Sequence, residues 1–407
     1  MPTLLQINTV VNSGSTGHIV EEIGQLAIAN GWKSYIAYGR NHCSSYSSLI
    51  KIGTDFDVKM HGLRTRLFDK HGFGSKQATK ILIERIKAIK PDIIHLHNIH
   101  GYYLNIETLF KYLAVANIPI VWTLHDCWPI TGHCTHFDFV GCNKWKTACY
   151  ACPQRNEYPA SSLIDNSKRN YRDKLKFFCS VKNITIVPVS QWLENVVNES
   201  FLKNYPQKRI YNGVDINVFY PLSKSKDIKD KLGVGNRLML VGVASIWGNR
   251  KSLIDYIKLS ELIDKNIIIV LVGLSQKQLK NLPDNIIGLP RTENISELVE
   301  IYSAAEIVLN LSVEESFGMT TVEGLACGTP GIVYNCTASP ELVTFNTGII
   351  VERGNISEIL KAISQILNNK KSYYSDACRK EAESSFNNTS QFNEYVELYN
   401  KLLQSNS

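Results

Sequence analysis

The sequence predicts an α/β protein made of two doubly wound, Rossmann-like domains. Its 407 residues exceed what one ordinary core holds, since domains of about 200 residues or fewer are typical. Short runs rich in Ile and Val recur along the chain with amphipathic segments between them, and they form two successive series. Such runs are typical of parallel strands that are buried on both faces within βα units.

The expected strands follow one another in a regular order. Those of the first series cover residues 4–11, 34–39, 92–98, 119–126 and 184–190. Those of the second series cover residues 238–245, 267–273, 306–312 and 330–335.

Turn-forming and polar residues over 209–226 separate the two series. We therefore expect a first domain over 1–215 and a second over 216–385. The closing segment 386–407 is expected to form a helix that packs back on the first domain. One face of this helix would carry Phe392, Val396 and Tyr399.

The composition favours a cytoplasmic protein. No run of eighteen or more apolar residues occurs, and the start "MPTLLQINTVV" lacks a basic region ahead of its apolar stretch, so we interpret it as a strand and not a signal peptide. In the cytoplasm the ten cysteines would be largely reduced.

The net charge of +7 is concentrated between Lys59 and Lys90, where nine basic residues stand with only Asp69 and Glu84. Two interpretations stay open: a solvated helix face, or a surface for an anionic membrane or a phosphate-bearing acceptor. Nucleic acid is not expected as a partner, because no nucleic-acid-binding module is visible.

Ligands of open α/β sheets bind beyond the carboxyl ends of the strands, so the loops there hold the candidate residues. After the first strand, glycines permit a tight turn that could point backbone N–H groups at a phosphate; plain turn chemistry is the alternative. The residues concerned are Gly14, Ser15 and Thr16.

Two further strands of the first domain end in polar residues that could hydrogen-bond ligand hydroxyls or polarise a leaving group. They are His97, Asn98, His100, His125 and Asp126. Structural histidines with satisfied hydrogen bonds are the alternative. His125 is the strongest candidate, because an acid follows it directly after a very apolar strand.

In the second domain, Arg250 and Lys251 open a helical segment, where their charge opposes the helix dipole. A bound diphosphate would remove this conflict. In "EESFGMTTVEGLACGTP", Glu315 lies in a loop and Gly318 lets the backbone approach a ligand. A helix expected from Met319 would place Glu323 in its early turns; its amides suit a phosphate, and the carboxylates suit hydroxyl donors.

The two acids form an E-x7-E motif. With "IYNGVD", "LHD" and Lys251, it resembles the retaining GT-B glycosyltransferases of family GT4 over nearly the whole chain. The stretches "PDIIHLHNIHGYYLN" and "TLHDCWPITGHC" look like a bacterial surface-polysaccharide branch of that family.

The resemblance implies a UDP- or GDP-sugar bound mainly by the second domain and a glycan or lipid-linked acceptor held by the first. Glu323 would bind the ribose hydroxyls, Glu315 the donor sugar, and Lys251 the diphosphate. Family members often carry an arginine five residues before that lysine; Ile246 stands there in this chain, and Arg250 would substitute. The remaining donor contacts would come from Phe317, Gly318, Met319 and Thr320.

On the acceptor side, the resemblance implies that His125 touches the transferred sugar. The acceptor itself would meet His97, Asn98, His100 and Asp126. No DxD motif follows a strand, so no catalytic metal is expected. The implied process is capsule, O-antigen or exopolysaccharide biosynthesis, at the inner face of the plasma membrane. Alternatives are a nucleotide-sugar epimerase or hydrolase and a non-catalytic nucleotide-sugar-binding protein.

Four cysteines fall within a polar segment of nineteen residues, "CTHFDFVGCNKWKTACYAC". Four thiolates have the number and softness for a tetrahedral structural zinc that pins this loop. Free buried cysteines and two disulfides are the alternatives. The proposed ligands are Cys134, Cys142, Cys149 and Cys152.

Overall fold

The computed structural model describes residues 1–223 and 226–404, and the chain divides into two compact units. The first unit comprises Met1–Tyr211 and the chain from Gln391 onward, and the second comprises Asn212–Ser390. The first stretch of this unit runs to Tyr211, and the boundary expected at residue 215 lies four residues further along the chain. Residues 224–225 of the expected linker and 405–407 of the expected terminal helix lie outside the described residues.

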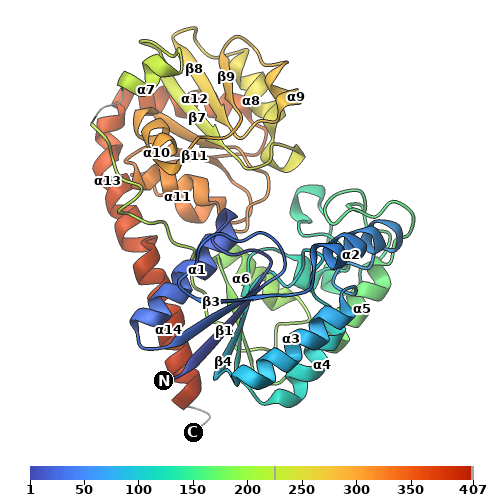
Figure 1. The fold of residues 1–407 in the computed structure, drawn as a ribbon. Coiled ribbons are helices and arrows are strands. Elements are labelled where there is room, and N and C mark those ends of the chain that lie inside the picture. Colours follow the sequence, from blue (N-terminus) through green and yellow to red (C-terminus); the bar gives the residue numbers. More distant parts are fainter. Residues whose placement is uncertain (224–225, 405–407) are drawn as a thin grey trace. The chain divides into compact units, whose positions relative to one another are not determined.

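The first unit is built on a parallel six-stranded sheet in the order β3-β2-β1-β4-β5-β6 (Figure 1). Its strands are β1 (Thr3–Asn8), β2 (Lys33–Tyr38), β3 (Ser48–Lys51), β4 (Ile93–Leu96), β5 (Ile120–Leu124) and β6 (Ile184–Pro188). Its helices are α1 (Gly14–Ala29), α2 (Asp55–Phe68), α3 (Lys76–Ile89), α4 (Ile106–Ala116), α5 (Ser167–Phe178) and α6 (Gln191–Glu199).

Helix α14 (Asn388–Gln404) completes the core of the first unit. Its apolar face shares one buried cluster with β1, α1 and Trp32. The Tyr399 hydroxyl lies 2.6 Å from Nδ1 of His95 on β4, and the Tyr395 hydroxyl lies 3.1 Å from that of Thr123 on β5. The helix therefore contributes both apolar area and buried hydrogen bonds to this sheet.

The second unit is built on another parallel six-stranded sheet, in the order β12-β11-β10-β7-β8-β9. Its strands are β7 (Leu238–Val243), β8 (Ile267–Val272), β9 (Ile286–Leu289), β10 (Ile307–Asn310), β11 (Gly331–Tyr334) and β12 (Gly348–Val351). Its helices are α7 (Lys226–Lys231), α8 (Leu253–Ser260), α9 (Gln276–Leu279), α10 (Ile295–Ala304), α11 (Met319–Ala326), α12 (Ile356–Asn369) and α13 (Lys371–Ser385). The expected class, two doubly wound α/β domains, is confirmed.

Short 3₁₀ turns occupy loops that matter for the sites. The long segment between β5 and α5 contains η1 (Trp128–Ile130), η2 (Asp138–Val140) and η3 (Lys144–Lys146) as its helical structure. In the second unit, η4 (Asn249–Lys251) precedes α8, and η5 (Ser339–Leu342) follows β11. Arg250 and Lys251 thus lie in a separate turn just before α8 begins. Over residues 1–223 and 226–404, no helix combines the length and apolarity needed to cross a bilayer.

Candidate active site

The core of the candidate site in the second unit is a carboxylate held between two cations. Glu315 lies in the loop after β10, and its carboxylate forms an ion pair with the Lys251 ammonium. Arg250 Nη1 lies 3.5 Å from Glu315 Oε2 and donates to the backbone carbonyl of Glu314 at 2.7 Å. The Val313 amide donates to the Arg250 carbonyl at 2.9 Å, which fastens the two loops together.

These contacts set the charge of the cluster. Burial alone would raise the pKa of Glu315, but the nearby Lys251 and Arg250 bring that pKa down to about 2. Burial lowers the pKa of Lys251, an effect that Glu315 opposes. With an ionised carboxylate between two cations, the cluster carries surplus positive charge, which suits an anionic ligand.

The N-terminus of α11 lies directly after this loop. Gly318 has φ 115°, a left-handed conformation, and an added Cβ there would meet Leu342 Cδ1 at 2.9 Å. The Phe317 ring is buried and packs edge-on against Phe386 with ring centroids 5.9 Å apart. Helix α11 then begins at Met319, as predicted, with no acid in its first turn. The Thr321 amide donates to the Gly318 carbonyl at 3.0 Å, so the amides of Met319 and Thr320 are the ones at this N-terminus that suit an anion. Thr320 in this turn is half-buried.

Glu323, on the second turn of α11, has different surroundings. The Tyr302 hydroxyl donates a hydrogen bond to its Oε2 at 2.9 Å. Burial raises the pKa of Glu323 to about 7, and the hydrogen bond from Tyr302 opposes this only in part. The side chain can therefore take up or lose a proton near neutral pH, and when ionised it is an acceptor for hydroxyl groups.

A pocket of ≈ 560 Å³ opens where β7, β8 and β9 end. The Trp247 indole donates to the Val272 carbonyl at 2.9 Å, and the Gln278 amide donates to the Trp247 carbonyl at 2.8 Å. These two hydrogen bonds hold Trp247 in place as one side of the pocket. Ile246 is 78% exposed here. The lining residues are Ser245, Ile246, Trp247, Gly273, Leu274, Ser275, Gln276, Gln278, Pro290 and Arg291.

Sequence reasoning missed this pocket, although one signal pointed to it. Ser245 ends one expected strand and is followed by Ile246 and Trp247, and Gly273 ends the next and is followed by Leu274 and Ser275. The rule that ligands bind beyond strand carboxyl ends would have included both. Pro290 and Arg291 could not have been found this way, because β9 was not among the expected strands.

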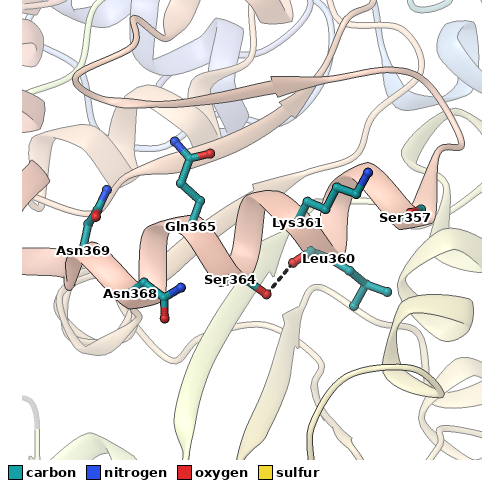
Figure 2. A pocket seen from close by; sticks show the side chains of 7 residues that line it. All are labelled: Ser357, Leu360, Lys361, Ser364, Gln365, Asn368 and Asn369. Carbon is teal, nitrogen blue, oxygen red and sulfur yellow. Dashed lines mark hydrogen bonds between the residues drawn. The ribbon is translucent and has the colours of Figure 1, made fainter.

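A second pocket, of ≈ 570 Å³, runs along α12 (Figure 2). Every lining residue comes from this one helix, and Ser364 Oγ donates within it to the Leu360 carbonyl at 2.9 Å. Its side chains are amides, hydroxyls, one leucine and Lys361, with no carboxylate. We assign it no part in the chemistry.

The first unit carries a separate group of polar residues at the carboxyl ends of β4 and β5. His100 Nε2 lies 2.8 Å from Asp126 Oδ2, and Asp126 Oδ1 accepts the Trp128 amide at 2.8 Å. Burial alone would raise the pKa of Asp126, but the interactions with His100 in particular lower it to about 2. An ionised carboxylate therefore stands at this edge of the sheet.

His97 and His125 form the neighbouring pair. His97 Nδ1 lies 3.1 Å from His125 Nε2, and the rings stack with centroids 5.4 Å apart. Burial lowers the pKa of His125 to about 4, with Asp126 opposing, so His125 is neutral at neutral pH. His97 is 2% exposed and also bonds Gln6 through Nε2 at 3.2 Å, so its visible role is to position His125.

The other predicted residues of the first unit lie in two loops. Asn98 is half-buried, and its carbonyl accepts bonds from Tyr103 and Thr9 at 2.7 and 3.0 Å. Gly14, Ser15 and Thr16 open helix α1, where Gly14 has φ 62°. Ser13 makes no side-chain capping bond, and the first turn of α1 has no acid, which keeps these amides suited to a polar ligand.

The four clustered cysteines are free thiols, as are the other six. Cys134 and Cys152 are hydrogen-bonded to each other through sulfur, and the Cys149 sulfur accepts the Gly132 amide at 3.2 Å. Among the described residues, no three His, Cys, Asp or Glu side chains have the spacing of a metal-bound set.

Comparisons with known proteins match both units. Residues 20–218 match the family described as Glycosyltransferase Family 4, and residues 224–384 match Glycosyl transferases group 1. The colanic acid biosynthesis glycosyl transferase WcaC of Escherichia coli (strain K12) is 28% identical over 194 residues, or 43% of this chain and 47% of WcaC. An uncharacterised 41.2 kDa protein in the cps region of Klebsiella pneumoniae is 22% identical, over 78% of this chain and 81% of its own.

The chain spans about half the length of WcaC and 58% of MJ1069, an uncharacterised glycosyltransferase of Methanocaldococcus jannaschii. Among solved structures, sucrose-phosphate synthase from Thermosynechococcus elongatus aligns with a TM-score of 0.72 at 16% identity, covering 100% of both chains. Anabaena HepE in complex with UDP aligns with a TM-score of 0.67 at 16% identity, covering 98% of this chain and 100% of HepE. HepE is also solved with UDP-glucose. The two family matches and the shared fold show that the chain belongs to the family 4 type of GT-B glycosyltransferases.

Proposed function

We propose that this chain transfers a sugar from a nucleotide diphosphate sugar to a hydroxyl of a glycan or lipid-linked acceptor, with retention of the anomeric configuration. The observation that carries the proposal is the cluster of Glu315, Lys251 and Arg250 beside the N-terminus of α11. It joins surplus positive charge to the N-terminal amides of a helix, and both favour the binding of a diphosphate.

In this proposal the second unit binds the donor. Lys251, Arg250 and the backbone amides from Phe317 to Met319 take the diphosphate, and ionised Glu323 accepts hydrogen bonds from the ribose. The pocket lined by Trp247 and the end of β9 takes the base. The UDP and UDP-glucose complexes of the structural neighbour HepE support a nucleotide-sugar donor.

Catalysis in this proposal is mainly electrostatic. As the bond to the diphosphate breaks, negative charge grows on the leaving group and oxocarbenium character grows on the sugar. Preorganised donors aimed at that charge stabilise the transition state most, and Lys251 with the α11 amides are such donors. Glu315 holds the Lys251 ammonium in place through their ion pair. Its carboxylate also accepts a hydrogen bond from a hydroxyl of the donor sugar. Attack by the acceptor hydroxyl from the leaving-group face gives retention.

The first unit, in this proposal, serves the acceptor. Neutral His125 hydrogen-bonds the transferred sugar, and the Asp126–His100 pair accepts a hydroxyl proton or hydrogen bond from the acceptor. Asn98 adds a polar group, and His97 positions His125. The first-turn amides of α1, at Gly14, Ser15 and Thr16, provide a further polar contact to the donor.

We further propose that the acceptor lies at the cytoplasmic face of a membrane and belongs to polysaccharide biosynthesis. The relatives WcaC and the cps-region protein support this assignment. Helix α2 presents exposed Phe56 and Leu63, 70% and 48% accessible, next to the exposed Arg64 and Arg66. Apolar residues flanked by basic ones suit the surface of an anionic bilayer.

A donor panel tests the proposal. The purified chain is incubated with UDP- and GDP-sugars, with and without a lipid-linked acceptor, and free nucleoside diphosphate is measured. Release that requires the acceptor supports transfer. Release or isomerisation without acceptor indicates a hydrolase or epimerase, and tight binding without turnover indicates a binding protein. Product anomers resolved by NMR decide between retention and inversion.

A further inference from the structure

We infer that Lys174 on α5 positions the Asp126–His100 pair of the first unit, acting through the turn η1. The inference rests on the proposed function, in which this pair serves the acceptor, and it adds a residue that was not predicted from the sequence. Lys174 is a positioning residue in this account, because its contacts reach the pair through Trp128.

Lys174 holds both ends of η1. Its side chain is fully buried, and its amino group donates hydrogen bonds to the carbonyl of Trp128 at 2.6 Å and to that of Thr131 at 2.9 Å. Trp128 is the first residue of η1, and Thr131 directly follows its last. The amino group also lies 3.4 Å from the centre of the Trp128 ring. Two carbonyls and an aromatic face thus match the three N–H groups of an ammonium.

Trp128 in turn contacts both members of the pair. Its backbone amide donates to Asp126 Oδ1 at 2.8 Å, and Asp126 Oδ2 lies 2.8 Å from His100 Nε2. The ring centroids of Trp128 and His100 lie 5.2 Å apart. A displacement of Trp128 would therefore move the carboxylate and the imidazole together.

The backbone of η1 alone holds Trp128 weakly. The Ile130 amide donates to the Cys127 carbonyl at 3.2 Å and the Thr131 amide to the Trp128 carbonyl at 3.4 Å, both longer than the usual N–H···O distance of about 2.9 Å. Turns of the 3₁₀ type also have less favourable hydrogen-bond geometry than α-helices. The two bonds from Lys174 are shorter, so we expect them to fix the turn.

This contact does not depend on the charge of Lys174. Burial lowers the pKa of Lys174 to about 7, and the negatively charged groups that oppose this effect include Asp126. A neutral amine keeps two N–H groups, so both hydrogen bonds to η1 persist when the proton leaves.

Kinetics with matched variants give the first test. Lys174→Met keeps an apolar stem and removes the donor, and it should lower kcat with the acceptor about tenfold or more, because small displacements of a reacting group are costly. Nucleotide affinity should stay unchanged, since the donor binds the second unit in the proposed function. Lys176→Met removes an exposed lysine of the same helix and should keep kcat. A Lys174 variant with the kcat of this control would overturn the inference.

A second control separates positioning from stability. Lys371 donates to the carbonyls of Ser303 and Ala305 at 2.6 and 2.8 Å, an arrangement like that of Lys174 but in the second unit. Lys371→Met should lower the Tm and leave kcat nearly unchanged, whereas Lys174→Met should lower both. A lower Tm with unchanged kcat in Lys174→Met would indicate a purely structural role and overturn the inference. Lys174→Gln, which keeps an N–H donor, should have an intermediate kcat and takes the place of Lys174→Met if that variant does not fold.

A double variant tests whether Lys174 acts through the pair. Asp126→Asn combined with Lys174→Met should be about as active as Asp126→Asn alone, because the second change then has no ionised pair left to displace. Additive losses would show that Lys174 acts elsewhere, and they would overturn the inference.

NMR spectra of the His100 ring nitrogens test the inference without turnover. These signals, assigned with His100→Gln, should shift in Lys174→Met and keep their wild-type positions in Lys176→Met and Lys371→Met. Unchanged His100 signals in Lys174→Met would overturn the inference. If the unmodified chain transfers no sugar but the His100 signals shift as expected, only the proposed function is overturned.

Discussion

Glu315 and Glu323 lie in one short segment, yet their ionisation differs because their neighbours differ. Burial favours the protonated form of both. Two cations bring the pKa of Glu315 down to about 2, whereas Glu323, with Tyr302 as its hydrogen-bond donor, has a pKa raised to about 7. The contacting groups therefore decide the charge of each acid. We accordingly expect the two acids to contribute differently, Glu323 to nucleotide binding and Glu315 to turnover.

The first prediction separates these tasks. Glu323→Ala should weaken UDP or GDP binding about tenfold, the equivalent of about 1.4 kcal/mol, because hydrogen bonds to the ribose are lost. Glu315→Ala should reduce turnover more than nucleotide affinity. Calorimetry and steady-state kinetics measure both effects. Nucleotide affinity and activity like wild type in both variants would refute the assignment.

The second prediction concerns pH. Glu323 is protonated below pH about 7 and ionised above it, and the carboxylate is the stronger acceptor for ribose hydroxyls. Nucleotide affinity should therefore rise as the pH increases through about 7. Glu323→Gln provides the control. Its nucleotide affinity still changes with the ionisation of the diphosphate, but residue 323 no longer contributes an ionisation of its own. Parallel affinity curves for the two proteins would contradict the prediction.

The third prediction concerns Lys251. Lys251→Ala should lower kcat about 10²–10³-fold, since a donor aimed at the leaving group is lost. Lys258→Ala is the matched control, because Lys258 is exposed and lies on the following helix α8. Turnover should need no added divalent cation. A Lys251 variant as active as the control would exclude this role.

At the scale of elements, the sequence predicted the inner strands and missed three at the edges. β3, β9 and β12 stand at sheet edges and are partly exposed. β3 has only Leu49 and Ile50 as apolar residues, whereas the apolar runs IIGL of β9 and GIIV of β12 are visible in the sequence and were overlooked. The inner strands are buried on both faces, which favours longer apolar runs. The start of helix α11 was predicted correctly, because Gly318 directly precedes its first residue, Met319, in the sequence.

Contacts between elements were beyond sequence reasoning. The motif indicated Glu315 and Lys251 separately, but their ion pair joins loops 64 positions apart, and His100 meets Asp126 across 26 positions. Loop geometry fixes such pairs, and a single sequence carries no pattern for it. The neutral state of His125 depends on burial and was equally hidden.

Helix α2 gives a prediction at this scale. Replacing Arg64, Arg66 and Lys70 by Ser should weaken binding to anionic vesicles, at about 1 kcal/mol per charge, and leave donor hydrolysis nearly unchanged. A control with the same change in net charge replaces the exposed Lys258, Lys265 and Lys361 of the second unit. Equal sedimentation of the two variants with vesicles would reject the membrane contact.

At the scale of the whole molecule, the chain leaves the first unit at Tyr211 and returns to it at Gln391. The returning helix α14 bonds the sheet through Tyr399 and His95, and the His95 ring lies 3.8 Å from the His97 ring. Because His97 in turn bonds His125, the end of the chain supports the polar residues of the first unit.

Tyr399→Phe tests this support. Removing the hydroxyl leaves a buried ring nitrogen of His95 unpaired, at a cost of about 1–3 kcal/mol, and should lower the Tm by roughly 2–10 °C. Tyr373→Phe, at a position 66% exposed, is the matched control. Thermal unfolding followed by circular dichroism measures both, and equal Tm values would show that α14 contributes little through this bond.

The return of α14 also governs how such a protein is made and recombined. During synthesis the first unit cannot close its core until α14 has left the ribosome, because Phe392, Tyr395 and Tyr399 belong to that core. An exchange of the second unit between related chains accordingly needs two junctions, one at Tyr211 and Asn212 and one at Ser390 and Gln391. A single crossover would join the first unit of one parent to the closing helix of another, and their packing surfaces would have to match.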